Sequence, residues 1–536
     1  MDTDTRGEVR HGQRVLAKIS DGTVRPEHKI IFTFHRIYTP WVANQTEYYH
    51  VAVDGAAISP CPTFRVRGGP AEYARLIVPS TVRPGVPFRV LLVSLDRYDN
   101  VSSTYYDRVR LTVEDGQELS REFSFQGRSI TSAVLEEEGV FRLAAHGLRG
   151  DSYLADGYRS EAVISNPVRV AERPNGPYWG DIHVHSHISA DAMGNELYQY
   201  ARDVSGLDFA GVCDHANADL PEQWERIKRW VRECNEDHRF VTILGYEGGD
   251  EGIHHSNIYY PNDDIDFTGD TFLQKTQMDH DRLGQHLEET GALSQLHQSG
   301  TCNTDMRKNY FPQTKVIEIF SSWGQSEYYN PDHALSYESN RVRYPETRLT
   351  ISGRGPFYAR DAWGEGKRFA AIASSDDHFG QPGKAHRGIT GVIASEFTRR
   401  GVFEGLHTGS CYATTGERVL LDFRANGLPM GSELSLNRNK EVEFTVEVHG
   451  TDVLCSVEVF RHRFGPGETS VCQWESAFHR DIPDVGLKGT AQRDLTTSFT
   501  EAYVGPTVYY LRVRQKYFVK DRPVYAWSTP IWLSDA

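Results

Sequence analysis

Histidine and carboxylate side chains stand at the ends of several short apolar segments in the middle of this 536-residue chain. In open α/β sheets and parallel barrels, the groups at the carboxyl ends of neighbouring strands converge on one edge, where active sites form. The residues at such ends are His183, His185, His215, Glu247, His297, Asp376 and His378. Imidazole and carboxylate ligands suit Zn²⁺, Mn²⁺ or Fe²⁺, so this pattern predicts a metal site.

The spacing within two of these ends supports that chemistry. His183 and His185 are two residues apart, as are Asp376 and His378. In a strand, residues i and i+2 point to the same side, so each pair can hold one ion together. An HxH pair taken alone is more often a structural or surface pair. The prediction of a metal therefore rests on several strand ends considered together.

The elements that must position these residues fall into three zones. Segments 29–172 and 421–536 alternate apolar and polar residues between turns, as in 88–95 and 442–448, and both predict β-sandwich modules. Segment 173–420 alternates strand-like bursts with helical patterns, including helices expected over 221–234 and 279–290, which favours a parallel α/β arrangement. The polar residues 1–28 are expected to form a tail.

Composition excludes several classes of protein. The net charge is −15, which disfavours binding to nucleic acid or to an anionic membrane surface. No apolar run is long enough for a spanning helix, and the first residues show no signal peptide. The seven cysteines are scattered and form no CxxC pair, as expected of reduced thiols in a cytoplasmic protein. We expect a small-molecule substrate; the sequence leaves the oligomeric state open, and assembly as a homo-oligomer is compatible with it.

The set of candidate ligands resembles that of the PHP (polymerase and histidinol phosphatase) metallohydrolases. Further short motifs, SNP at 165–167, YWGD at 178–181 and YATTG at 412–416, resemble a bacterial PHP-containing family of unknown function. The resemblance implies an α/β fold, a distorted seven-stranded (β/α) barrel flanked by the β-sandwich modules, with two or three divalent ions. It places His183, His185, Glu247 and Asp376 on one ion, Glu247 with His255 and His297 on a second, and Asp191, His215 and His378 on a third.

Three functions remain open from the sequence. The first is a hydrolase of a small organic ester, amide or carbamate that uses a metal-bound hydroxide held near Glu247 and Asp376. The second is a PHP-type phosphoesterase, in which Arg387 is the leading candidate for a phosphate clamp. The third is a non-catalytic, metal-bound scaffold with ligand-binding β modules. Asp214 is a candidate for proton transfer or for orienting a ligand, and Glu318 is either a buried carboxylate behind the ligands or an outward-facing residue.

Overall fold

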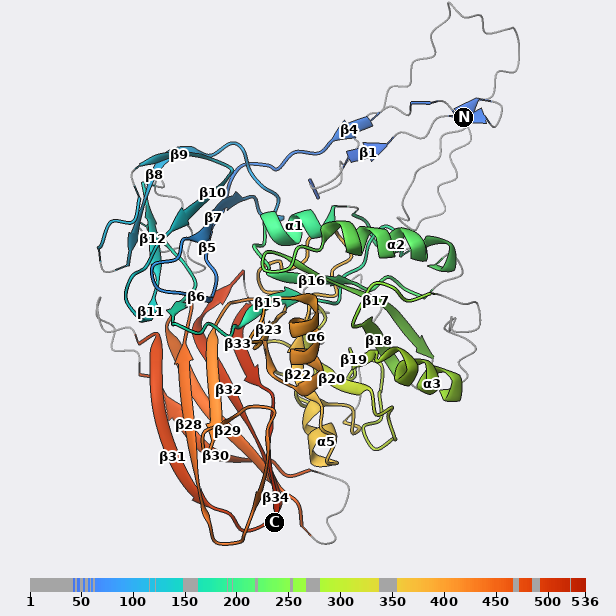
Figure 1. The fold of residues 1–536 in the computed structure, drawn as a ribbon, viewed down its shortest axis with the longest axis vertical. Helices are drawn as coiled ribbons and strands as arrows, with labels where there is room; N and C mark the ends of the chain where they lie inside the picture. Colours follow the sequence, from blue (N-terminus) through green and yellow to red (C-terminus); the bar gives the residue numbers. More distant parts are fainter. Residues whose placement is uncertain are drawn as a thin grey trace, which may run out of the picture. The chain divides into compact units, whose positions relative to one another are not determined.

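The chain is described by a computed structural model. The described residues are 42–43, 46–48, 52–53, 56–57, 59–60 and, from residue 63 on, all except 115, 121, 148–161, 190, 195, 217–219, 251–253, 267–279, 337–353, 466–471, 484–491 and 521. The expected polar tail, 1–28, lies outside this part. Figure 1 shows the order of the elements along the chain.

Two small sheets form the N-terminal part. The first has the order β10 (Arg128–Ala133), β7 (Phe88–Leu95), β5 (Tyr73–Ile77), and the second β13 (Ala162–Ile164), β12 (Leu143–His146), β8 (Tyr106–Val113), β9 (Phe123–Gln126). Val90 and Leu92 of β7 and Leu111 of β8 belong to one buried apolar cluster. Residues from both sheets therefore share a core, as in a sandwich of two packed sheets.

Three smaller sheets complete this region. β6 (Thr81–Val82), β14 (Val168–Val170) and β11 (Gly139–Phe141) form a three-stranded sheet, β1 (Thr46–Tyr48) pairs with β4 (Thr63–Arg65), and β2 (Ala52–Val53) pairs with β3 (Ala56–Ala57). Helix α1 (Leu197–Asp203) contacts this part of the chain as well, because Tyr200 packs with Val93 and Leu95. Its hydroxyl donates to the carbonyl of Asp99 at 2.7 Å. The N-terminal sheets are thus joined to the segment that carries the candidate ligands.

A 16-stranded sheet dominates the rest of the chain. Its first strands are β15 (Tyr178–Asp181), β16 (Phe209–Val212), β17 (Val241–Asp250), β18 (His254–Tyr260), β19 (Leu293–Leu296), β20 (Thr314–Ser321), β21 (Gly324–Gln325), β22 (Ala370–Ala373), β23 (Ile389–Val392) and β24 (Cys411–Thr414). Strands β15, β16, β19 and β22 are buried along their whole length or nearly so. This burial explains the continuous apolar sequences of β16 and β22, whereas β15 and β19 also bury the polar residues Asp181, Ser294 and Gln295.

The same sheet continues into the C-terminal strands, because β24 pairs antiparallel with β33. These strands are β27 (Glu433–Leu436), β29 (Leu454–Arg463), β30 (Glu475–Asp481), β32 (Thr507–Val519), β33 (Arg522–Ser528) and β34 (Ile531–Asp535). A separate four-stranded sheet contains β26 (Leu428–Pro429), β25 (Leu420–Ala425), β28 (Glu441–His449) and β31 (Asp494–Ala502). The ring of Phe444 in β28 packs at a tilt against the ring of Tyr509 in β32, so the two sheets pack on each other. The division of the chain at 172 and 420 stays a prediction.

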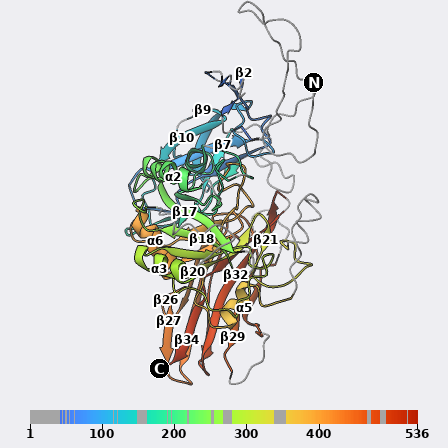
Figure 2. The same ribbon diagram turned by 90° about the vertical axis from the view of Figure 1, so that its right-hand side faces the viewer.

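The helices are few and short. Besides α1, the described residues form α2 (Leu220–Cys234), α3 (His280–Thr290), α5 (Ala359–Gly364) and α6 (Arg399–Thr408). The helices expected over 221–234 and 279–290 are confirmed by α2 and α3. Helix α6 contacts β17, β20 and β23, and α2 contacts β17. Helix α5 lies beside β32 (Figure 2). Trp363 of α5 packs against Tyr510 of β32. No described helix is long and apolar enough to span a bilayer.

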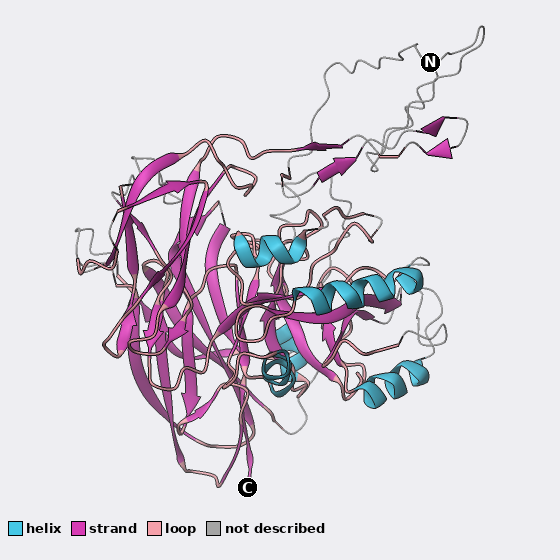
Figure 3. Cartoon of the chain, turned by 45° about the horizontal axis from the view of Figure 1, so that its top comes forward, coloured by secondary structure: helices cyan, strands magenta, loops and turns pink. Residues whose placement is uncertain are grey.

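The expected α/β fold with a (β/α)₇ barrel is wrong. The described residues form only five helices. Strands make up most of their regular structure, as the colouring in Figure 3 shows. Strands β15–β16–β17 are parallel, but β17–β18, β18–β19 and β15–β23 are antiparallel. A (β/α) barrel requires parallel strands joined through helices. Period-two apolar patterns reveal strands but not their direction, and β18, which begins four residues after the end of β17, runs antiparallel beside it.

Candidate metal centre

Four of the expected ligands form one buried group: His183, His185, Glu247 and Asp376. The two histidines follow β15, Glu247 lies in β17, and Asp376 follows β22. A backbone bridge between Val184 and Asp377 holds the segment after β15 beside the segment after β22. Ends of three strands far apart in the sequence therefore meet at this point.

The distances within this group match the shape of a metal site. His183 Nε2 lies 3.3 Å from both Glu247 Oε2 and Asp376 Oδ1. His185 Nε2 lies 3.1 Å and 3.2 Å from the same two oxygens. Ligand atoms about 2.0–2.1 Å from a tetrahedral ion are about 3.3 Å from one another. These four separations are therefore those of four donors around a single cation.

Two of these atoms form no hydrogen bond. His185 Nε2 and Asp376 Oδ1 are buried and have no hydrogen-bond partner, although they lie close together. Asp376 also has φ of +51°, in the left-handed region that non-glycine residues seldom occupy. Buried polar atoms are nearly always hydrogen-bonded, and backbone strain gathers at functional sites. The four donors therefore fit a bound metal ion.

A second group adjoins the first on its more exposed side. It consists of His185, His215 and His378. Asp191 reaches this group, with Oδ1 3.4 Å from His215 Nε2 and Oδ2 3.8 Å from His378 Nε2. The Asp191 side chain is 63% exposed, whereas that of His185 is fully buried. The centre thus opens to solvent at Asp191.

His297 and Glu318 complete the centre from β19 and β20. His297 Nε2 lies 3.6 Å from Glu247 Oε1. Glu318 Oε2 lies 2.9 Å from His183 Nδ1 and accepts a bond from Gln295 Nε2 at 3.0 Å. A carboxylate on Nδ1 leaves Nε2 of His183 to face the other donors, as in carboxylate–histidine–metal arrangements. His183, His297 and Glu318 are also close enough to hold an ion as a third group.

The charges of the centre balance one another. Burial lowers the pKa of His183, but Asp376 and Glu318 outweigh it and raise that pKa well above its ordinary value. Burial raises the pKa of Glu247, but His297, His183 and His185 lower it well below its ordinary value. Burial raises the pKa of Glu318 to about 7. The buried carboxylates thus need a compensating positive charge nearby, which either protonated histidines or a bound cation would supply.

Several supporting contacts were not predicted from the sequence. Trp323 donates its indole N–H to Asp376 Oδ2 at 2.5 Å, and the Gln298 amide donates to the same oxygen. Ser189 Oγ lies 3.1 Å from His185 Nδ1 and donates to Asp214 Oδ1 at 2.9 Å. The contacts of Trp323 and Gln298 with Asp376, and that of Ser189 with Asp214, join segments that only the fold brings together, whereas Ser189 lies four residues after His185 on one loop.

The remaining predicted site residues have different positions. Asp214 accepts hydrogen bonds from the backbone and hydroxyl of Ser186, which indicates a role in holding the loop after His185. Among the described residues, no hydrogen bond or ion pair joins Arg387 to the four-ligand group. His255 lies in β18, but its side chain lies outside the described part of the chain. The roles of all three stay predictions.

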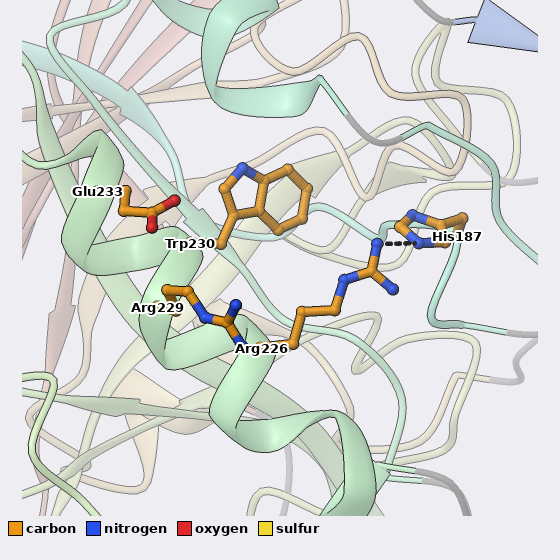
Figure 4. Close-up of a pocket in the computed structure, with 5 residues that line it drawn as sticks. All are labelled: His187, Arg226, Arg229, Trp230 and Glu233. Carbon is orange, nitrogen blue, oxygen red and sulfur yellow. Dashed lines mark hydrogen bonds between the residues drawn. The ribbon is translucent and has the colours of Figure 1, made fainter.

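A pocket of about 220 Å³ lies beside the loop that carries Asp191. Figure 4 shows its lining residues His187, Arg226, Arg229, Trp230 and Glu233. His187 Nδ1 donates to the carbonyl of Gly194 at 3.0 Å, so its Nε2 accepts from Arg226 at 2.9 Å. His187 therefore ties α2 to this loop and does not join the ligand groups.

Comparison with known proteins gives relatives but no function. No family model matches the chain. An uncharacterized protein of Chlamydia pneumoniae is 25% identical over 513 residues, covering 87% of this chain and 75% of that protein. One of Chlamydia trachomatis serovar D is 25% identical over 519 residues, covering 88% and 75%. Among solved structures, the PKD domain of an M14-like peptidase from a Thermoplasmatales archaeon is 15% identical to this chain. The match covers 19% of this chain and 97% of that domain, with a TM-score of 0.14.

Proposed function

We propose that this chain is a metal-dependent hydrolase of a small organic ester, amide or carbamate. The observation that carries the proposal is the buried group of His183, His185, Glu247 and Asp376, whose donor atoms have the separations of a tetrahedral site. The expected ions are Zn²⁺, Mn²⁺ or Fe²⁺, since the donors are imidazoles and carboxylates. The resemblance to PHP enzymes supports two or three ions, and the cytoplasmic location expected from the cysteines remains part of this proposal.

Residues around the candidate ligands hold the ligand side chains in position for such a site. A divalent ion bound there supplies Lewis acidity, which hydrolysis of a carbonyl or phosphoryl compound needs. Glu318 orients the His183 ring, and Ser189 does the same for His185. Trp323 holds the second oxygen of Asp376, so that the first oxygen faces the other donors. Such supporting bonds keep the donors in place before any ion arrives.

The exposed side of the centre is where a substrate would bind. His215 and His378 retain 23% and 17% of their side-chain exposure, and Asp191 lies beside them. Burial lowers the pKa of His215, but Asp191 and Glu247 outweigh it and raise that pKa to about 10. A polar opening next to buried donors is the usual form of a hydrolytic metal site.

A phosphoester is the second candidate substrate. It is favoured by Lys384 and Arg387, two cationic residues in the loop that follows His378. Cationic side chains bind phosphoryl oxygens, and arginine can do so through two bonds at once.

The experiment that separates the two candidates uses three compounds with one aryl leaving group: its acetate, carbamate and phosphate. Metal-reconstituted protein is expected to cleave the acetate or the carbamate, and His183→Ala is expected to lose that activity. His407→Ala, an exposed histidine of α6, is the matched control and retains it. Cleavage of the phosphate alone would establish the second candidate. Full activity of metal-treated His183→Ala would refute a role for this centre.

A further inference from the structure

A turn of the N-terminal part of the chain contacts the loop that carries two of the candidate metal ligands. The turn follows β7 and consists of residues 96–100; we call it the sandwich turn. The loop follows β22 and consists of residues 376–384, beginning with Asp376 and including His378; we call it the ligand loop. Gln381 and Asn100 are 281 positions apart in the sequence, yet their side chains are hydrogen-bonded to each other.

The sandwich turn is buried although it carries three polar side chains. Asp96, Asp99 and Asn100 are 4%, 2% and 3% exposed. Connecting segments almost always run over the surface of a protein, so a buried one has its polar groups paired with the parts that cover it. The carboxylate of Asp96 pairs within the N-terminal part, because it accepts from the backbone N–H groups of Tyr98 and Gly69, both at 2.8 Å. Asp99 and Asn100 also have partners beyond that part.

Gln381 of the ligand loop is the main partner of the sandwich turn. Its side chain is fully buried, and its Nε2 donates to the carbonyl of Tyr98 at 3.0 Å and to Oδ1 of Asn100 at 3.1 Å. Its Oε1 accepts from Lys384, whose Nζ also lies 3.7 Å from Asp99 Oδ2. Both polar atoms of the Gln381 side chain are therefore engaged where the two segments meet.

The ligand loop is also held against the candidate metal centre, through Asp377. Its Oδ2 accepts from the backbone N–H of Gln381 at 2.7 Å, and its carbonyl accepts from the backbone N–H of His185 at 2.9 Å. The preceding residue, Asp376, has φ of +51°, a conformation that persists only where surrounding contacts impose it. Gln381 is thus linked through Asp377 to the backbone that carries Asp376.

We propose that Gln381 is a positioning residue for the metal centre, and that the sandwich turn is the part of the N-terminal region that keeps the ligand loop in place. Gln381 acts through Asp377. Without its bonds to the sandwich turn, the ligand loop would relax, and Asp376 would no longer be held beside the other donors. The inference gives the N-terminal sheets a task. It rests on the metal centre of the proposed function, but not on the reaction catalysed there.

The test is the binding of Co²⁺ to the full chain, measured by calorimetric titration and by the visible absorption spectrum at saturating Co²⁺. The spectrum reports the geometry of the donors, which a loss of stability alone does not change. Gln381→Met keeps the length of the side chain and removes its hydrogen bonds. This variant is expected to bind Co²⁺ about tenfold more weakly, the low end for residues that orient ligands, and to have an altered spectrum.

Arg169→Gln is the matched control. Arg169 of β14 pairs with Glu447 of β28 at 3.0 Å, so it also joins the N-terminal sheets to a distant part of the chain, through a contact that includes no residue of the ligand loop. This variant is expected to keep the Co²⁺ affinity and the spectrum of the unaltered chain, even if its melting temperature falls.

Lys384→Met is the second variant, because its side chain is 11% exposed and its replacement leaves the bonds of Gln381 to the sandwich turn in place. It is expected to show the same changes to a smaller degree, and it decides the question alone if circular dichroism shows that Gln381→Met does not fold.

Unchanged Co²⁺ affinity and spectrum in both Gln381→Met and Lys384→Met would overturn the proposal and leave the metal centre standing. Equal changes in Arg169→Gln would also overturn it, because the effect would then come from general docking of the N-terminal sheets. An unaltered chain that binds no Co²⁺ would overturn the metal centre and the proposal together.

Discussion

Replacement of Glu327 by glutamine is expected to destabilise the junction between the segment that carries the candidate ligands and the C-terminal strands. Glu327 is buried, and its Oε1 accepts from Arg512 Nη1 at 3.1 Å and Arg360 Nη2 at 3.2 Å. Tyr510 donates to the same oxygen, and Trp527 donates to Oε2 at 2.8 Å. One carboxylate thus joins α5 to β32 and β33.

The size of the effect follows from the pKa of Glu327. Burial raises this pKa, but the guanidinium groups of Arg512 and Arg360 outweigh burial and lower it from 4.5 to about 2. A depression of that size corresponds to about 3 kcal/mol of stability. Because the folded-state pKa is the lower one, this stability is present above about pH 4.5 and is lost as the pH falls toward 2.

The assay is urea unfolding followed by tryptophan fluorescence between pH 7 and pH 3. Glu327→Gln is expected to unfold at lower urea than the unaltered chain at pH 7, and the difference is expected to shrink below about pH 4.5. Glu404→Gln is the control, since Glu404 pairs with Arg400 on an exposed helix face and such pairs contribute little. Equal urea midpoints at pH 7, or a difference that does not change with pH, would refute the reasoning.

Three further outcomes are expected. Trp323→Phe removes the indole bond to Asp376 and should weaken metal binding by about 10–100-fold in a calorimetric titration; unaltered affinity would show that this bond does not position the ligand. Gly180→Ala places a Cβ 2.2 Å from ring atoms of Phe209 and should cost about 1–3 kcal/mol, seen as a lower melting temperature; an unchanged melting temperature would contradict the packing. Removal of metal by a chelator should lower the melting temperature, because an ion at 100 times its dissociation constant adds about 2.7 kcal/mol; a melt insensitive to both chelator and added Zn²⁺ would argue against a bound ion.

The grouping of the candidate ligands could largely be predicted from the sequence. The i, i+2 spacing of His183 and His185 depends only on local strand geometry, and the structure does bring both to Glu247 and Asp376. The contacts that support these residues could not be predicted from the sequence. Trp323, for example, meets Asp376 across 53 positions of sequence, and nothing in the residues around either one indicates that contact.

The fold was harder to predict from the sequence than the candidate site was. The apolar patterns predicted β7 and β28 well. β28 alternates buried residues with exposed or half-buried ones, and β7 is buried nearly throughout. The direction of a strand, however, depends on the connection that precedes it. Strand β18 runs antiparallel to β17, and β24 extends the sheet into β33 of the C-terminal part. Neither the antiparallel return of β18 nor the long-range pairing of β24 with β33 leaves a periodic pattern in the sequence.

The most direct test of the central claim is the metal content of the purified chain and of two variants, His183→Ala and His407→Ala. The claim predicts at least one divalent ion per unaltered chain after reconstitution and dialysis, the same content in His407→Ala, and a loss of the ion at the four-ligand group in His183→Ala. Equal metal content in all three proteins, or none in the unaltered chain, would contradict it.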